Sequence, residues 1–116
     1  MRIPGSSSAV TALSAESVRL DVSASNVANV STDGYRAMRV TNEATAGGGV
    51  RPRIDEPATP AGQLLTGDDG RDRVLSNVDL GAEVVTQISA QHAFEANLAV
   101  LRTGDEMLKA LIDSKL

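Results

Sequence analysis

Tyr35 and Phe94 are the only aromatic residues of this chain, which contains no tryptophan. Aromatic rings usually supply a large part of the apolar surface that a small domain buries. The 116 residues are enough for one domain, but the apolar residues are mainly Ala, Val and Leu. Such side chains suit slender, closely packed helices and argue against an ordinary compact core.

Glycine and proline divide the chain into three segments, 1–30, 31–75 and 76–116. The middle segment holds most of the ten glycines and three of the four prolines, which is typical of irregular or short-stranded structure. Both end segments carry helical patterning instead. We therefore predict a mainly α chain, with a long helix at each end and a short irregular or hairpin-like excursion between them.

The first helix is expected over about 6–30. Ser6, Ser7 or Ser8 is the predicted cap, because a serine oxygen satisfies free N–H groups of the first helical turn. The turn at 31–34 ends the helix, and we expect Gly34 to take a positive φ there. Small or apolar residues recur at alternating spacings of three and four, as along one helix face: Val10, Leu13, Ser17, Leu20, Ala24 and Val27.

The last segment predicts one helix of more than 30 residues. Ser76 or Asn77 is the predicted cap, and Asp79 favours the positive end of the helix. Two such helices leave apolar flanks uncovered, and contiguous exposed apolar area usually marks an interface. An assembly protein is therefore predicted. The apolar positions at helical spacing are Leu80, Val84, Ile88, Phe94, Leu98, Leu101, Leu108 and Ile112.

The middle segment shows a weaker pattern. Residues 35–41 alternate charged and apolar side chains, which predicts a half-buried strand, and 50–54 and 73–75 are its expected partners. The glycine triplet 47–49 lacks the Lys-Ser/Thr of a phosphate-binding loop and precedes no predicted helix. We interpret it as a flexible linker.

Few residues are suited to catalysis or to metal binding. There is no cysteine, and His92 is the only histidine, so thiolate sites and histidine clusters are excluded. The spacing of Asp68, Asp69 and Asp72 does not match a calcium-binding loop. We therefore expect no catalytic residue, no metal, no cofactor and no small-molecule substrate, and the chain is not expected to be an enzyme.

Charge and hydropathy exclude two further classes of partner. A net charge of −4 argues against nucleic acid, whose binding requires a clustered basic patch. The apolar stretches are far shorter than the ~20 residues of a membrane-spanning helix, so no membrane insertion is expected. The first residues lack the apolar region of a cleaved secretory signal.

Each end of the chain carries a sequence signature. Residues 25–36 (SNVANVSTDGYR) form a helix pattern with two asparagines that ends in a glycine turn, and this pattern resembles that of the bacterial flagellar rod and hook axial proteins. Residues 76–80, 91–97 and 105–108 resemble the C-terminal helix of that family, although His92 replaces a common arginine and Phe94 a common tyrosine. The residues that match family motifs are Asn26, Asn29, Gly34, Tyr35, Asn77 and Asn97.

The resemblance implies a structural protein. The middle segment is too short for a distal rod or hook protein, which leaves the short proximal rod proteins. Their terminal helices would pair as an antiparallel coiled coil. Copies of the chain, with other rod subunits, would then pack helically into the hollow shaft that crosses the periplasm and transmits torque. Delivery by the flagellar type III export apparatus, without a cleaved signal, is also implied.

The apolar helix positions are then the expected subunit interface. Two questions stay open: Asn26 and Asn29 either cap the helix locally or hold the bend, and Gln91 and Asn97 are either solvated or fix helix register. The expected interface residues are Leu13, Leu20, Val27, Val84, Ile88, Phe94, Leu98, Leu101, Leu108 and Ile112.

A second function of a different class is a soluble helical adaptor that binds one partner helix. Such an adaptor forms a closed dimer or heterodimer, whereas a rod subunit forms an open-ended stack. The signature at 25–36 favours the rod subunit, because an adaptor does not need that particular turn.

The substitution Leu101→Asp tests the apolar pattern. An unpaired charge buried in a helix contact costs several kcal/mol, so we expect the variant to be synthesised and to abolish motility. Swarming of a strain that carries only this variant is the measurement. Normal swarming would count against the placement of Leu101 in a helix–helix contact.

Overall fold

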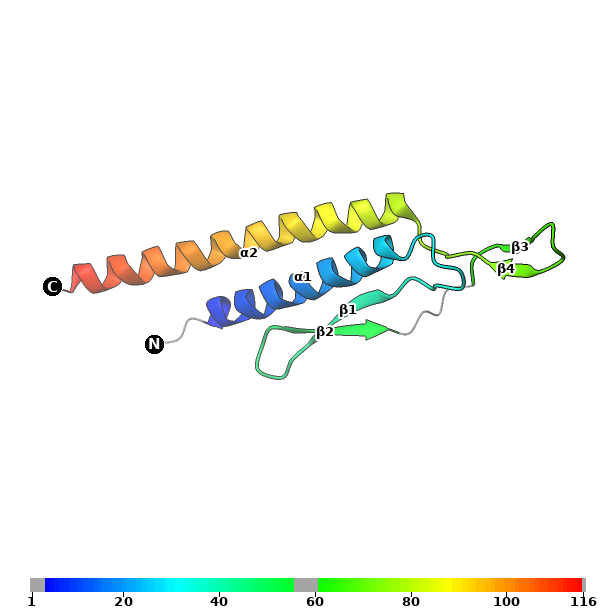
Figure 1. Cartoon of the computed structure of the whole chain (residues 1–116). Coiled ribbons are helices and arrows are strands. Elements are labelled where there is room, and N and C mark those ends of the chain that lie inside the picture. The colour runs from blue at the N-terminus through cyan, green and yellow to red at the C-terminus, as the bar shows by residue number, and fades with distance from the viewer. Residues whose placement is uncertain (1–3, 56–60, 116) are drawn as a thin grey trace.

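The computed structural model describes residues 4–55 and 61–115. Two helices, α1 (Pro4–Ala28) and α2 (Leu80–Ser114), lie side by side and run antiparallel (Figure 1). Between them in sequence come β1 (Arg39–Ala44), β2 (Val50–Asp55), β3 (Leu64–Thr66) and β4 (Asp72–Val74). The predicted mainly helical fold with a short β excursion is confirmed.

The molecule is long and thin, with extents of 80 × 25 × 13 Å. Its radius of gyration is 20.4 Å, against ~13 Å for a compact domain of this length. The apolar residues that are buried are small ones, as the scarcity of aromatic residues predicts. They are Ala9, Ala15, Val22, Ala37 and Ala90.

The predicted caps of both helices are wrong. The structure starts α1 at Pro4, so the prediction of a serine cap is wrong. Proline is favoured at the first helical position because its φ is already set for a helix. The cap of α2 is Asp79, whose Oδ1 accepts a hydrogen bond from the Ala82 N–H at 3.3 Å, and neither Ser76 nor Asn77 has this role.

The turn after α1 has the predicted backbone conformation. The Asn29 N–H still donates to the Ser25 carbonyl, and the chain then bends until Gly34. Gly34 has a φ of +75°, which confirms the prediction of a positive φ. Its N–H donates to the Val74 carbonyl at 2.6 Å, so the turn is joined to the last residue of β4.

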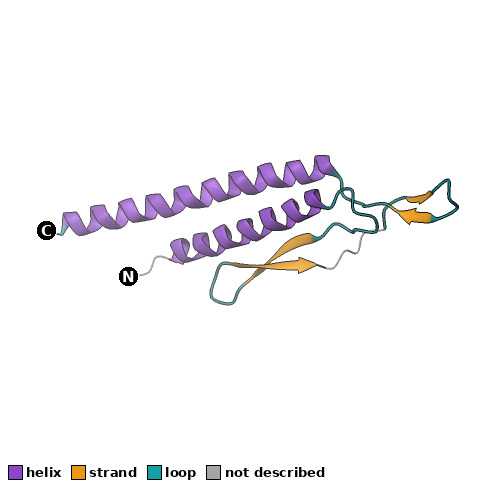
Figure 2. Cartoon of the chain, in the orientation of Figure 1, coloured by secondary structure: helices purple, strands orange, loops and turns teal. Residues whose placement is uncertain are grey.

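The strands form two separate antiparallel hairpins. In one, β1 pairs with β2 from Arg39 opposite Asp55 to Ala44 opposite Val50, and α1 lies between this hairpin and α2 (Figure 2). In the other, β3 pairs with β4 at the far end of the molecule. The expected pairing of 73–75 with 35–41 is therefore wrong, because the turn at 67–70 closes a local hairpin first.

The glycine triplet is not a flexible linker, and that interpretation is wrong. Gly48 and Gly49 have φ values of +85° and +91°, which L-residues rarely adopt. The triplet rests against α1, where a Cβ on Gly49 would lie only 2.5 Å from Thr11 Oγ1. The same Thr11 oxygen accepts a hydrogen bond from the Val50 N–H at 3.1 Å. The tip of the β1–β2 hairpin is thus docked on α1.

Ion pairs strengthen the outer face of this hairpin. Glu43 accepts hydrogen bonds from the guanidinium groups of Arg51 and Arg53, both at 3.1 Å. These bonds lower the pKa of the exposed Glu43 carboxyl below its ordinary value. A carboxyl with a lowered pKa stabilises the folded state at neutral pH and loses that effect as the pH falls through the lowered pKa.

Gly49→Ala tests the docked tip. The left-handed backbone conformation costs about 1–2 kcal/mol for an L-residue, and the new methyl group would push against Thr11. We expect faster exchange of the Val50 amide hydrogen and a lower free energy of unfolding. Gly47→Ala is the matched control, because Gly47 lacks a positive φ and has open space around it. Equal effects of the two substitutions would contradict the docked tip.

Candidate functional site

Asn26, in the last turns of α1, is 1% exposed and satisfies its whole side-chain amide with hydrogen bonds. Its Oδ1 accepts from the Met38 N–H and from the Tyr35 hydroxyl, each at 3.0 Å. Its Nδ2 donates to the Met38 carbonyl and to Glu83 Oε1, also at 3.0 Å. One side chain thus joins α1 to the start of β1 and to α2.

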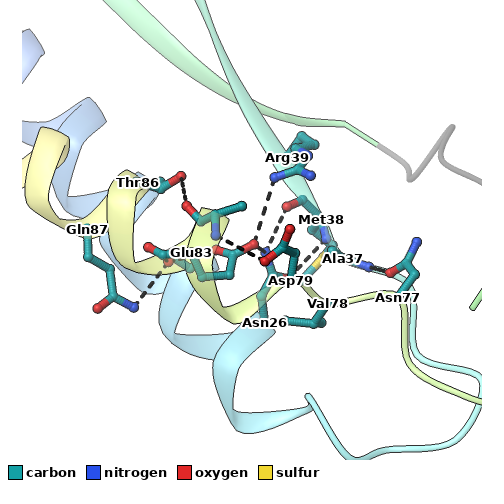
Figure 3. Close-up of polar contacts among 12 residues, drawn as sticks. Asn26, Ala37, Met38, Arg39, Asn77, Val78, Asp79, Glu83, Thr86 and Gln87 are labelled. Carbon is teal, nitrogen blue, oxygen red and sulfur yellow. Dashed lines mark hydrogen bonds and ion pairs between the residues drawn. The ribbon is translucent and has the colours of Figure 1, made fainter.

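Glu83, in the first turn of α2, is the second centre of the site and is 2% exposed. Its Oε2 accepts from Ser23 Oγ at 2.8 Å, and the Arg39 guanidinium lies 3.8 Å from its Oε1 (Figure 3). The Gln87 amide adds a donor to Ser23 Oγ at 3.1 Å. The helix N-terminus also favours a negative charge at this position.

Asn77 holds the same stretch of backbone from the other side. Its Oδ1 accepts from the Ala37 N–H at 2.6 Å, and its own N–H donates to the Tyr35 carbonyl at 3.2 Å. Side chains of Asn26 and Asn77 therefore bond backbone groups of Ala37 and Met38 that a strand partner would need. This is why β1 begins at Arg39, and why the predicted strand start at Tyr35 is wrong. We call Ser23, Asn26, Tyr35, Asn77 and Glu83 the polar cluster.

The polar cluster is built to fix backbone geometry. Ser23 donates to a carboxylate, as a nucleophile donates to a base, but Ser23 and Glu83 are only 1% and 2% exposed. Among the residues that the structure describes, no group of three or more His, Cys, Asp or Glu could hold a metal. A cleft of about 190 Å³ opens beside Glu83, lined by Arg19, Val22, Ser23, Asn26, Met38, Arg39, Val40, Glu83 and Thr86.

The remaining motif residues act locally. Asn29 donates to the Ser25 carbonyl at 2.9 Å and accepts from the Thr32 hydroxyl, so it caps the end of α1, whereas Asn26 holds the bend. Asn97 donates to the Ala93 carbonyl of its own helix at 2.9 Å. The exposed side chain of Gln91 donates to Glu95, one turn further along α2.

The ten residues predicted as a subunit interface stay a prediction, because a single chain contains no neighbouring subunit, but they differ in exposure. In a single chain, four of them lie 43–62% exposed on α2, namely Val84, Ile88, Leu98 and Ile112. The other six are half-buried, namely Leu13, Leu20, Val27, Phe94, Leu101 and Leu108. The fully buried residues of the helix pair are small or belong to the polar cluster, among them Ala15, Ala90, Asn26 and Glu83.

Sequence reasoning missed Ser23 and Glu83 as members of the site. A serine within a helix and an acidic residue in a first helical turn are both common at exposed positions, so their types gave no signal of burial. Glu83 directly follows Leu80-Gly81-Ala82, at the end of α2 that faces Asn26, and only the fold brings these two side chains together.

Two family models match the two ends of the chain. Residues 7–36 match the Flagella basal body rod protein family, and residues 75–114 match the Flagellar basal body rod FlgEFG protein C-terminal family. Both matches include members of the polar cluster. The chain belongs to the flagellar basal-body rod family, and it is a structural subunit of the rod.

Relatives identify the branch of the family. The chain is 42% identical to the flagellar basal-body rod protein FlgC of Yersinia enterocolitica, over 87% of this chain and 89% of that protein. It is 35% identical to FlgC of Salmonella typhimurium, over 84% and 86% of the two chains. FlgC of Borreliella burgdorferi is 31% identical over 90% and 91%. The similarity to FlgC confirms the prediction of a short proximal rod protein.

Exchanging charge within the polar cluster tests its role. Asn26→Asp removes the donors to Met38 and Glu83 and sets two carboxylates together, so we expect a loss of about 3 kcal/mol of stability. In the double variant with Glu83→Gln, the new amide at position 83 can donate to the carboxylate at position 26. This bond should recover part of the lost stability. Thermal unfolding of the purified chain and swarming of the strains are the measurements.

Asn29→Asp is the matched control for this exchange, because Asn29 bonds only to its own helix end and turn. It should cost much less than Asn26→Asp. If the double variant is no more stable than Asn26→Asp alone, the direct contact between the two side chains is refuted.

Proposed function

We propose that copies of this chain pack helically, with each other and with other rod subunits, through the outer faces of α1 and α2. One observation carries the proposal: many large apolar side chains of α2 are exposed in the single chain. Nine of them are between 43% and 64% exposed, namely Leu80, Val84, Val85, Ile88, Leu98, Val100, Met107, Leu111 and Ile112.

The energetics favour burial of these side chains by neighbours. Burying one fully would contribute about 1.5–3 kcal/mol, whereas the contact between α1 and α2 already uses small residues such as Ala15 and Ala90. Small residues let two helices approach closely and leave the larger ones for outside contacts. This division supports a coiled-coil pair that serves as one building unit of a larger bundle.

The proposal extends to location and delivery. The subunit would leave the cell through the flagellar type III export apparatus without a cleaved signal and join a torque-transmitting shaft in the periplasm. Within the described residues, no helix is both long and apolar enough to cross a membrane. The exposed apolar side chains of α2 would then meet protein neighbours. No catalytic role is proposed for the chain.

Ile88→Asp separates assembly from folding. Ile88 is 50% exposed on α2, so a carboxylate there is hydrated in the free subunit and buried against a neighbour in the rod. We expect normal helix content and normal export into the medium, with loss of swarming. Ser89→Asp is the control, because Ser89 is exposed on the same turn and should tolerate the charge.

Swarming of the Ile88→Asp strain at the level of the Ser89→Asp strain would contradict the proposed interface. A closed dimer of the purified chain that also persists in the Ile88→Asp variant would favour a helical adaptor instead.

A further inference from the structure

The β1–β2 hairpin carries outward-pointing backbone groups along both of its edges. In an antiparallel pair, residues that bond to the partner strand alternate with residues whose N–H and carbonyl point outward. The Val50 N–H turns away from β1 to Thr11 Oγ1, and Ala44 lies opposite Val50. The backbone groups of Ala44 therefore point outward as well, and so do those two and four residues earlier, at Asn42 and Val40.

The edge of β2 is closed to a further strand. Thr11 already accepts from the Val50 N–H, and Pro52 has no N–H to donate. Proline on an edge strand is one of the devices by which natural proteins prevent pairing with another chain. β1 has no proline, and among the described residues nothing bonds to the outward backbone groups of Val40 and Asn42. The hairpin thus protects one edge and leaves the other open.

Asn26 occupies the first outward position of this open edge. It bonds to both the N–H and the carbonyl of Met38, two residues before Val40, as a paired strand residue would. Beyond Asn26 the edge borders the cleft of about 190 Å³, which Arg39 and Val40 also line. The Arg39 guanidinium lies 3.8 Å from Glu83 Oε1, too far for a hydrogen bond, so its N–H groups can donate to an incoming chain. The cleft therefore suits a backbone that continues the ladder begun by Asn26.

We propose that the open edge of β1 binds an extended segment of a different protein, which adds a third strand to the hairpin. The inference rests on the proposed rod function, because it places the subunit in a larger assembly. Strand addition draws its affinity from backbone hydrogen bonds and its specificity from pockets for alternate side chains. The segment pairs with Val40 and Asn42, presents a carboxylate side chain to Arg39, and places a small apolar side chain in the cleft beside Val22.

The described strands of this chain do not supply the segment. β3 and β4 pair with each other at the far end of the molecule, and each has only three residues (Figure 2). In a second copy, the β2 edge is closed by Thr11 and Pro52. Pairing of two β1 edges is isologous and closes into a two-fold dimer, which does not extend into a shaft. The occupant is therefore a different protein.

Amide hydrogen exchange tests the open edge in the purified chain and in isolated basal bodies. In the purified chain we expect fast exchange at Val40 and Asn42, and slow exchange at Thr41 and Glu43, whose N–H groups point to β2. In basal bodies, exchange at Val40 and Asn42 should be more than about tenfold slower than in the purified chain. Slow exchange of these two amides in the purified chain, or an unchanged rate in basal bodies, overturns the proposal.

Asn42→Pro removes one outward N–H and keeps the ladder between β1 and β2, because Asn42 lies opposite Pro52 at a pair without hydrogen bonds. Asn42→Ala is the matched control, since it changes only the side chain. We expect both purified variants to keep slow exchange at Thr41. In basal bodies, only Asn42→Pro should lose the protection of Val40, and equal protection in both variants contradicts strand pairing.

A photo-crosslinking amino acid in place of Ala44 identifies the occupant in basal bodies. We expect a crosslink to an extended segment of a different protein, and its loss when Asn42→Pro is added. A crosslink to β1 of a second copy, or to a helix of any protein, overturns the proposal.

The outcomes also separate this inference from the rod function. Basal bodies that contain the chain, but whose Val40 and Asn42 amides stay unprotected, refute the strand contact and leave the rod function standing. Absence of the chain from basal bodies refutes both.

Discussion

The fold depends on one asparagine that bonds to three parts of the chain at once. Asn26 pairs with both the N–H and the carbonyl of Met38, as a neighbouring strand would, and also donates to the buried Glu83. These groups are out of water, so each lost partner would cost the full desolvation of the other. The direction in which β1 leaves α1, and the position of α2 along α1, therefore follow from a single buried amide.

The polar cluster compensates for the small apolar core that comes with the scarcity of aromatic residues. A thin helix pair cannot gain a large apolar core, and Ala15 and Ala90 at its centre contribute little area. Directional hydrogen bonds define a unique arrangement where area alone would allow sliding. Many of the larger Val, Leu and Ile side chains remain exposed, where neighbouring subunits can bury them.

The sequence predicted the parts that depend on local patterns. The two helices follow from apolar periodicity, and the positive φ of Gly34 follows from the Asp-Gly turn. The start of α1 and the cap of α2 were mispredicted, because several adjacent serines, asparagines and aspartates offer equally good caps. The predicted interface residues stay predictions, since a single chain does not contain its neighbours.

Contacts between distant segments could not be predicted from the local sequence pattern. The burial of Glu83 depends on Ser23 and Asn26, some 60 residues earlier, and no local signal distinguishes it from a solvated glutamate. The glycine triplet looked loose because its fixed conformation comes from Thr11, also far away in sequence. Family resemblance found Asn26 and Asn77 as motif residues, but the reason for them lies in the backbone that they bond.

The placement of the polar cluster has a mechanical consequence. It clamps the helix pair at the end where β1 and α2 begin, whereas at the other end the pair is joined through small residues, with Ser6 beside Gly104. Directional bonds resist sliding and tilting, and contacts between small side chains resist them far less. The helix pair is therefore held against sliding by directional bonds at the hairpin end, and only by close packing of small residues where Ser6 lies beside Gly104.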